Sequence, residues 1–456
     1  MVDKLKLGEE ILANLASIQG KPHASLAHAD DFELPRLIGA DDGRSLQVTK
    51  AIDDLISSLA RQLKSERPES VKAVREAEYV SLVRAACGPV LAELDLDRPF
   101  AETGKELVSR VEKVVDEQIA AFPRREHAFG VTLFGNPGIA TFSIGPVTFE
   151  EWGVWLARKK ADGEIPALTE SRLRKAWGGG ALPKRKSSIA ALQEQNILRA
   201  MSRAPYVASV QIEGFAASAG LEAAASSVRL AITTVALLWP TPSRALEGIR
   251  LRFDPAHHTE KAVTFVPGRI VMGGVHMRGR PFGPTISSAD WKAGRAALAP
   301  VFAVAGEAID LLTNPQEEPP RVGVMRALLH SLQWFYAGCR ELNDPIAIVN
   351  FGASLDALAS GAGDQGILAL LKARFGLAPS DEAYHGGPTV EATVKDLYGE
   401  GRSQLVHGIS KRIGHDWAER RARIENLAHQ TLLACLEAVS QDQSIVKAKQ
   451  LRKNTK

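Results

Sequence analysis

The sequence of residues 397–408 is LYGEGRSQLVHG, in which Arg402 is followed five residues later by His407. In a straight helix this separation turns about 140° around the axis, so the two side chains are not stacked neighbours, although a long Arg side chain still reaches a shared groove. A His accepts or donates a proton near neutral pH, and an Arg offers a permanently charged, planar fork that matches phosphate oxygens. The pair therefore suits RNA cleavage without a metal. One His per chain is too few for both proton transfers, which favours a dimer that pools two copies of the pair across a two-fold axis.

The residues around this stretch predict a bundle of helices. Apolar residues at three- and four-residue steps indicate a long helix that ends near residues 343–345 and a second helix for which Pro345 suits the first turn. We expect a shorter helix around residues 366–375, a fourth that opens at Val390, and a last helix that closes an antiparallel bundle over residues 322–441. The segment NPQEEPP, residues 314–320, is typical of a linker before the bundle, and a basic tail is expected over residues 442–456. The apolar stripes are Leu328, Leu332, Phe335, Cys339 and Leu342; Ile348, Phe351, Leu355 and Leu358; and Ile424, Leu427, Leu432, Cys435 and Val439.

This part of the chain resembles the HEPN (higher eukaryotes and prokaryotes nucleotide-binding) ribonucleases. The pattern Tyr398…Arg402-Ser403…Val406-His407-Gly408, on the penultimate helix of the expected bundle, is similar to the Arg-x4–6-His signature of that family. Residues 332–336 and 351–358 are similar to the first two helices of the family, with Asp356 where its members commonly have Glu.

The resemblance implies a fold, an activity and a set of site residues. The fold is a bundle that dimerises, and the activity is metal-independent endonucleolytic cleavage of single-stranded RNA at the dimer interface, without a cofactor. The catalytic positions are Arg402 and His407, and Ser403 and Asp356 are expected to support them. We expect Lys411 and Arg412, which follow the motif, to bind RNA. Such proteins often act as toxins or as antiviral abortive-infection effectors.

Two blander interpretations of the motif stay open. In the first, Arg402 is a surface charge and His407 is a packed or capping residue before the Gly408 stop. In the second, the bundle is a non-catalytic HEPN module that mediates dimerisation and binds a nucleotide or a partner.

The chain before the bundle predicts an α+β fold that is mostly helical. Residues 1–128 show helical spacing, whereas residues 129–313 contain short β-rich pieces such as GVTLF and YVASVQI, typical of a mixed β/α domain. Strict alternation over residues 249–253 indicates a half-exposed strand. Helices, then a β-rich part, then a HEPN bundle resemble the arrangement of ApeA-type abortive-infection proteins, which implies a sensing role for a regulatory ligand or a phage-derived trigger.

Length and charge exclude some classes of protein. A chain of 456 residues exceeds what one hydrophobic core usually serves, so two or three domains are expected. Lys plus Arg number 56 against 53 for Asp plus Glu, so the overall field does not indicate a nucleic-acid binder, and any charged surface must be local. The apolar stretch 216–239 is interrupted by Glu222 and Arg229, which predicts a buried helix and no membrane association.

The cysteines and histidines favour a cytoplasmic protein without a bound metal. Cys87, Cys339 and Cys435 have no paired spacing, which argues against disulfides and a cysteine zinc site, and residues 1–10 do not form a secretory signal. His257 and His258 are adjacent and point in different directions in a helix or a strand, so they are not expected to share a metal ion. His429 lies beside an apolar stripe and is expected to be structural.

Overall fold

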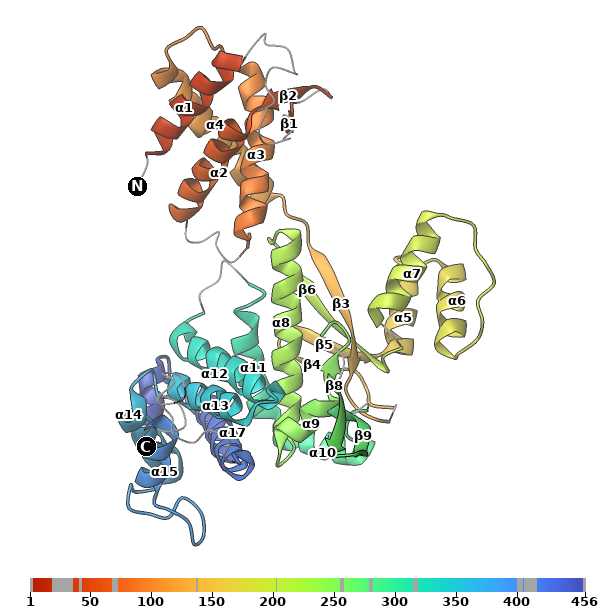
Figure 1. Ribbon diagram of the computed structural model, residues 1–456, viewed down its shortest axis with the longest axis vertical. Helices are drawn as coiled ribbons and strands as arrows, with labels where there is room; N and C mark the ends of the chain where they lie inside the picture. The colour runs from red at the N-terminus through yellow and green to blue at the C-terminus, as the bar shows by residue number, and fades with distance from the viewer. Residues whose placement is uncertain are drawn as a thin grey trace. The chain divides into compact units, whose positions relative to one another are not determined.

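The computed structural model of the chain describes residues 3–18, 36–40, 43–67, 73–136, 138–201, 203–254, 258–278, 282–314, 319–399, 405 and 416–453. The chain divides into two compact units. The first unit contains residues 1–125, 212–223 and 314–316, and the second contains residues 126–211, 224–313 and 317–456. Helices predominate and the sheets are small, so the prediction of a mostly helical α+β fold is confirmed at that level (Figure 1).

The described part of the first unit includes helices packed together and a short hairpin. Asp53 is buried and forms ion pairs with Arg84 (2.7 Å) and Arg36, which joins α2 to α3 and to the hairpin. A Cβ on Gly8 would lie 2.8 Å from the carbonyl oxygen of Gly104, so α1 and α4 cross at a distance that only glycine permits. The elements are α1 (Lys4–Ile18), β1 (Arg36–Gly39), β2 (Ser45–Val48), α2 (Lys50–Ser65), α3 (Glu76–Glu93) and α4 (Phe100–Ala120), with β1 and β2 antiparallel.

The second unit contains a five-stranded sheet with the order β4-β5-β6-β3-β7. Its strands are β3 (Arg125–Thr132), β4 (Phe142–Ile144), β5 (Val147–Glu151), β6 (Tyr206–Ile212) and β7 (Arg250–Leu251). Phe149 pairs with Ala208 in register, and its ring stacks on Phe142, which in turn contacts Trp291. Because side chains alternate along a strand, these residues mark one apolar face of the sheet.

The opposite face of the sheet is covered by three helices, α5 (Trp152–Ala161), α6 (Ala167–Trp177) and α7 (Ile189–Met201) (Figure 1). Val207, which neighbours Ala208 and so points to this second face, belongs to a buried cluster with residues of these helices. The other members are Trp155, Leu156, Ile165, Leu173 and Met201. The sheet therefore has a separate apolar core on each side.

The strand expected over residues 249–253 is shorter and more buried than its alternation indicates. Only Arg250 and Leu251 form β7, and Arg250 is 6% exposed although the alternation assigned it to solvent. Its register partner Thr132 is also buried, so this end of the sheet is covered on the polar face as well. The prediction of a half-exposed strand was therefore wrong at Arg250.

The apolar stretch 216–239 forms α8 (Ala217–Ala236), and its residues in the second unit are largely buried, as predicted. The remaining elements before the C-terminal helices are α9 (Pro242–Gly248), the hairpin β8 (His258–Val266) and β9 (Arg269–Arg278), α10 (Ser288–Ala297) and α11 (Ala299–Asp310). Over the described ranges, no single helix combines the length and hydropathy needed to cross a membrane, and one pair bent by 68°, α13 with α14, passes by length and composition alone.

Over its described residues, the C-terminal helical bundle, residues 322–441, contains α12 (Val322–Arg340), α13 (Asp344–Leu358), α14 (Gly363–Phe375), α15 (Val390–Tyr398) and α17 (Ala418–Gln441). The side chain of Asn343 caps α13 by accepting a hydrogen bond from the Ile346 N–H (3.3 Å), with Pro345 in the first turn. Ser331 and Ser354 share a buried hydrogen bond of 2.8 Å between α12 and α13. The helices expected here from apolar spacing are therefore present.

The described part of the expected basic tail is folded. Residues 448–452 form a short 3-10 helix, Ala448–Arg452, which contacts α14. Ile445 is 2% exposed and Leu451 is fully buried. Two apolar residues among the basic ones thus anchor this segment to the bundle, because burying them removes apolar surface from water.

Candidate functional site

The predicted catalytic and RNA-binding residues Arg402, Ser403, His407, Lys411 and Arg412 lie outside the described residues. The helices on either side of them are described. α15 ends at Tyr398, one residue after the buried Leu397, and α17 begins just after Trp417, which is 7% exposed. The bundle therefore anchors the chain at both ends of the motif.

Asp356, the second of the two predicted supporting residues, lies at the C-terminal end of α13. Its carboxylate accepts a hydrogen bond from the Gly363 N–H (3.2 Å), and its carbonyl oxygen accepts one from the Gly361 N–H (2.9 Å). A Cβ on Gly363 would lie 3.5 Å from the ring of Tyr398. Asp356 thus shapes the turn that contacts Tyr398, the residue with which the motif begins.

A short helix of the second unit, α9, is held between two helices of the bundle. Glu425 of α17 accepts hydrogen bonds from the backbone N–H and the hydroxyl of Ser243, each 2.8 Å long, at the N-terminal end of α9. Arg340 of α12 donates a hydrogen bond to the Leu246 carbonyl (2.8 Å) near its C-terminal end. A negative charge at the N-terminal end of a helix and a positive charge at its C-terminal end both interact favourably with the helix dipole. These contacts therefore stabilise the attachment of the bundle to the rest of the unit.

His429 of α17 makes a further contact between the bundle and the rest of the second unit. Its ring is 2% exposed, and Nε2 lies 3.0 Å from the carbonyl oxygen of Leu237, to which it must donate. Burial lowers the pKa of His429 below its usual value of 6.5, although the bond to Leu237 opposes this shift. The ring is therefore neutral near neutral pH, and the expectation that His429 is structural is confirmed.

Arg250 of β7 lies close enough to Arg252 and to Arg340 of α12 for their charges to act on it. Arg250 is 6% exposed, its Nε has no hydrogen-bond partner, and no described carboxylate pairs with it. Burial lowers the pKa of its guanidinium, and the charges of Arg252 and Arg340 lower it further. A buried cation without a counter-ion destabilises a fold, so an anion supplied from outside would offset this cost. Sequence reasoning missed this cluster because Arg340 is far from Arg250 and Arg252 along the chain.

The Trp and Tyr on α12 have different surroundings. The Tyr336 hydroxyl donates a hydrogen bond to Asp254 (3.1 Å), which is also paired with Arg229 (3.0 Å). Burial, followed by the charge of Asp254, raises the pKa of Tyr336 to about 12, so it remains a neutral donor. Trp334 is 45% exposed and does not belong to the core of the bundle.

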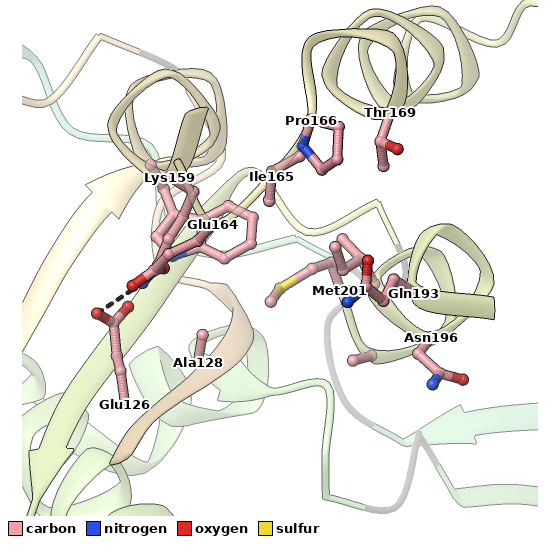
Figure 2. A pocket seen from close by; sticks show the side chains of 13 residues that line it. Glu126, Ala128, Lys159, Glu164, Ile165, Pro166, Thr169, Gln193, Asn196 and Met201 are labelled. Atoms are coloured by element: carbon pink, nitrogen blue, oxygen red, sulfur yellow. Dashed lines mark hydrogen bonds and ion pairs between the residues drawn. The ribbon is translucent and has the colours of Figure 1, made fainter. Parts of the chain in front are cut away.

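A separate pocket lies between the sheet and the helices α5, α6 and α7 (Figure 2). Its volume is about 400 Å³. Figure 2 shows Glu126, Lys159 and Glu164 on one side of the cavity and Gln193 and Met201 on the other. The lining residues are Glu126, Ala128, Trp155, Lys159, Glu164, Ile165, Pro166, Thr169, Gln193, Asn196, Ile197, Ala200 and Met201.

The sheet and α7 approach each other closely at Met201, which lines this pocket. A Cβ on Gly130 would lie 2.5 Å from the carbonyl oxygen of Met201, so glycine permits the end of α7 to rest on β3. Helices α5 and α6 and most of α7 lie between Ala128 and Met201 in the sequence. No local pattern therefore indicated that these two residues line one cavity.

The described side chains offer no group of three or more His, Cys, Asp or Glu residues able to hold a metal ion. Comparisons with known protein families, with curated proteins and with solved structures find no match to this chain.

Proposed function

We propose that this protein is a metal-independent endoribonuclease of the HEPN type, which cuts single-stranded RNA at the interface of a homodimer. The observation that carries the proposal is the sequence of residues 397–408, attached at both ends to a bundle whose helices follow the predicted order. A role as a toxin or as an antiviral abortive-infection effector belongs to the same proposal.

In the proposed reaction, the 2′-oxygen of a ribose attacks the adjacent phosphorus and the bond to the 5′-oxygen breaks. His407 of one subunit accepts the 2′-hydroxyl proton, and the protonated His407 of the partner subunit donates a proton to the leaving 5′-oxygen. Arg402 binds the phosphate oxygens as negative charge develops on them, because its guanidinium fork stays protonated. The products are a 2′,3′-cyclic phosphate and a 5′-hydroxyl.

The arginines at β7 and α12 support an anionic substrate. Arg252 and Arg340 are half-buried, and Arg250 is 6% exposed and has no carboxylate partner among the described residues. We propose that Arg252 and Arg340 contact RNA phosphates and that the positive charge of the buried Arg250 adds to the electrostatic attraction of the phosphates.

The test is cleavage of end-labelled single-stranded RNA in the presence of a chelator. Wild type should cut and leave cyclic phosphate ends, and His407→Ala should cut at least about 100-fold more slowly, since general acid–base catalysis typically contributes that much or more. His330→Ala is the matched control, because His330 is an exposed residue of the same bundle, and it should cut like wild type.

Unchanged cleavage by His407→Ala would contradict the proposal. If neither protein cuts RNA but both form dimers, the non-catalytic module for dimerisation and nucleotide or partner binding becomes the better interpretation. Loss of cleavage with the chelator would instead indicate a metal-dependent nuclease.

A further inference from the structure

The pocket between the sheet and α5–α7 includes a residue whose hydrogen-bond donor has no partner among the described residues. Trp155 is 5% exposed, and its indole Nε1 is buried without a hydrogen bond to any described residue. An indole N–H can only donate, and a buried donor left unpaired costs free energy. Trp155 is also one of the residues that line the cavity. A bound molecule that reaches Nε1 would supply the missing acceptor.

The charged groups of the pocket wall already satisfy one another. Lys159 donates to Glu126 (2.8 Å) and to Glu164. Burial alone would lower the pKa of Lys159, but the hydrogen bonds to these two carboxylates outweigh it and raise the pKa, so the ammonium stays charged.

Glu126 accepts further hydrogen bonds from Arg158 (3.4 Å) and from the Gln211 amide (2.9 Å). Arg158 also donates a hydrogen bond to Glu150 (2.7 Å), which is not one of the residues that line the pocket. A ligand with a net charge would have to break this network to find a counter-ion, so the wall favours an uncharged ligand.

The rest of the lining suits a ring with one polar edge. The side chains of Ile165, Pro166 and Met201 form apolar walls, and Met201 extends from α7 into the space beside Ala128 and Ile165 (Figure 2). Gln193 and Asn196 are exposed on α7 at the edge of the lining, and each amide offers a donor next to an acceptor. Paired donor and acceptor groups of this type complement the edge of a nucleobase.

We propose that this pocket binds an uncharged heteroaromatic compound of nucleobase or nucleoside size, with a ring or carbonyl acceptor that takes the hydrogen bond of Trp155 Nε1. The cavity of about 400 Å³ falls in the range of small-molecule sites. This proposal does not depend on RNA cleavage, because it rests on a different part of the second unit.

The probes are adenosine, guanosine, cytidine and uridine, each tested by equilibrium dialysis against the full-length protein at concentrations up to about 1 mM, the range of weak small-molecule binding. At least one nucleoside should bind wild type. Trp155→Phe keeps an aromatic side chain and removes the N–H, and it should weaken that binding about tenfold, the change that loss of one buried hydrogen bond produces.

A second variant blocks the cavity without touching its polar groups. Ala200 is exposed and lines the pocket, so Ala200→Trp should abolish binding, whereas Leu192→Trp, at an exposed position of the same helix outside the lining, should not. Circular dichroism verifies that each variant is folded. Absence of binding by all four nucleosides, or equal affinity of wild type and folded Trp155→Phe, would overturn the proposal.

Discussion

The contact between Glu425 and α9 provides a quantitative test of how the C-terminal helical bundle is attached. Glu425 is 4% exposed and accepts two hydrogen bonds from Ser243, both 2.8 Å long. Hydrogen bonds to a charged group contribute about 1.5–3 kcal/mol each. Part of this is offset in the variant, because the folded wild type must desolvate the carboxylate and the variant need not. We therefore predict that Glu425→Ala lowers the free energy of unfolding by about 2–4 kcal/mol.

Two further variants test whether the effect depends on the charge of Glu425 and on its position in α17. Glu425→Gln keeps one acceptor without the charge and should cost about 1–2 kcal/mol. Glu419→Ala removes an exposed Glu from the same helix, whose partner is Arg423, and should change stability by less than about 0.5 kcal/mol.

Urea denaturation followed by circular dichroism and by tryptophan fluorescence measures these differences. Because the sheet and the bundle lie in one compact unit, both signals from that unit should shift together in Glu425→Ala. A loss below about 0.5 kcal/mol in this variant, or a shift confined to the helical signal, would refute the inferred role of this contact.

Two further predictions concern buried charge. Burial holds the pKa of His429 below 6.5 in the folded chain. As the pH falls below 6.5, the unfolded chain therefore binds a proton that the folded chain does not, and the free energy of unfolding decreases. His429→Gln should make the dependence of Tm on pH shallower than in wild type. Arg250→Met should leave the free energy of unfolding unchanged or raise it by roughly 1 kcal/mol in buffers without multivalent anions, while weakening RNA binding measured by fluorescence anisotropy. A clear loss of stability in Arg250→Met, or unchanged RNA affinity, would contradict the interpretation of the arginine cluster.

Local patterns sufficed for the C-terminal helices. The steps from Leu328 to Cys339, the helix start at Pro345 and the apolar stripe that ends at Val439 correspond to α12, α13 and α17. Leu342, which was expected to continue the first stripe, lies beyond the end of α12 and is 39% exposed. Helical periodicity acts over one or two turns, so a single segment of sequence contains all the information needed to predict which face is buried. The same holds for α8, where the apolar stretch with few charges predicted a buried helix.

The sites depend on contacts between segments far apart in the chain. Glu126 and Lys159 meet Met201 at one cavity, Glu425 reaches Ser243, and Arg340 lies near Arg250. No spacing rule links these residues, because such pairs form only when the sheet and helices have packed. The sequence alone therefore determined the C-terminal helices, the buried helix α8 and the Arg402–His407 hypothesis. Tertiary packing decided which polar groups became buried without a partner, since burial depends on every element that covers a residue and not on its neighbours in the chain.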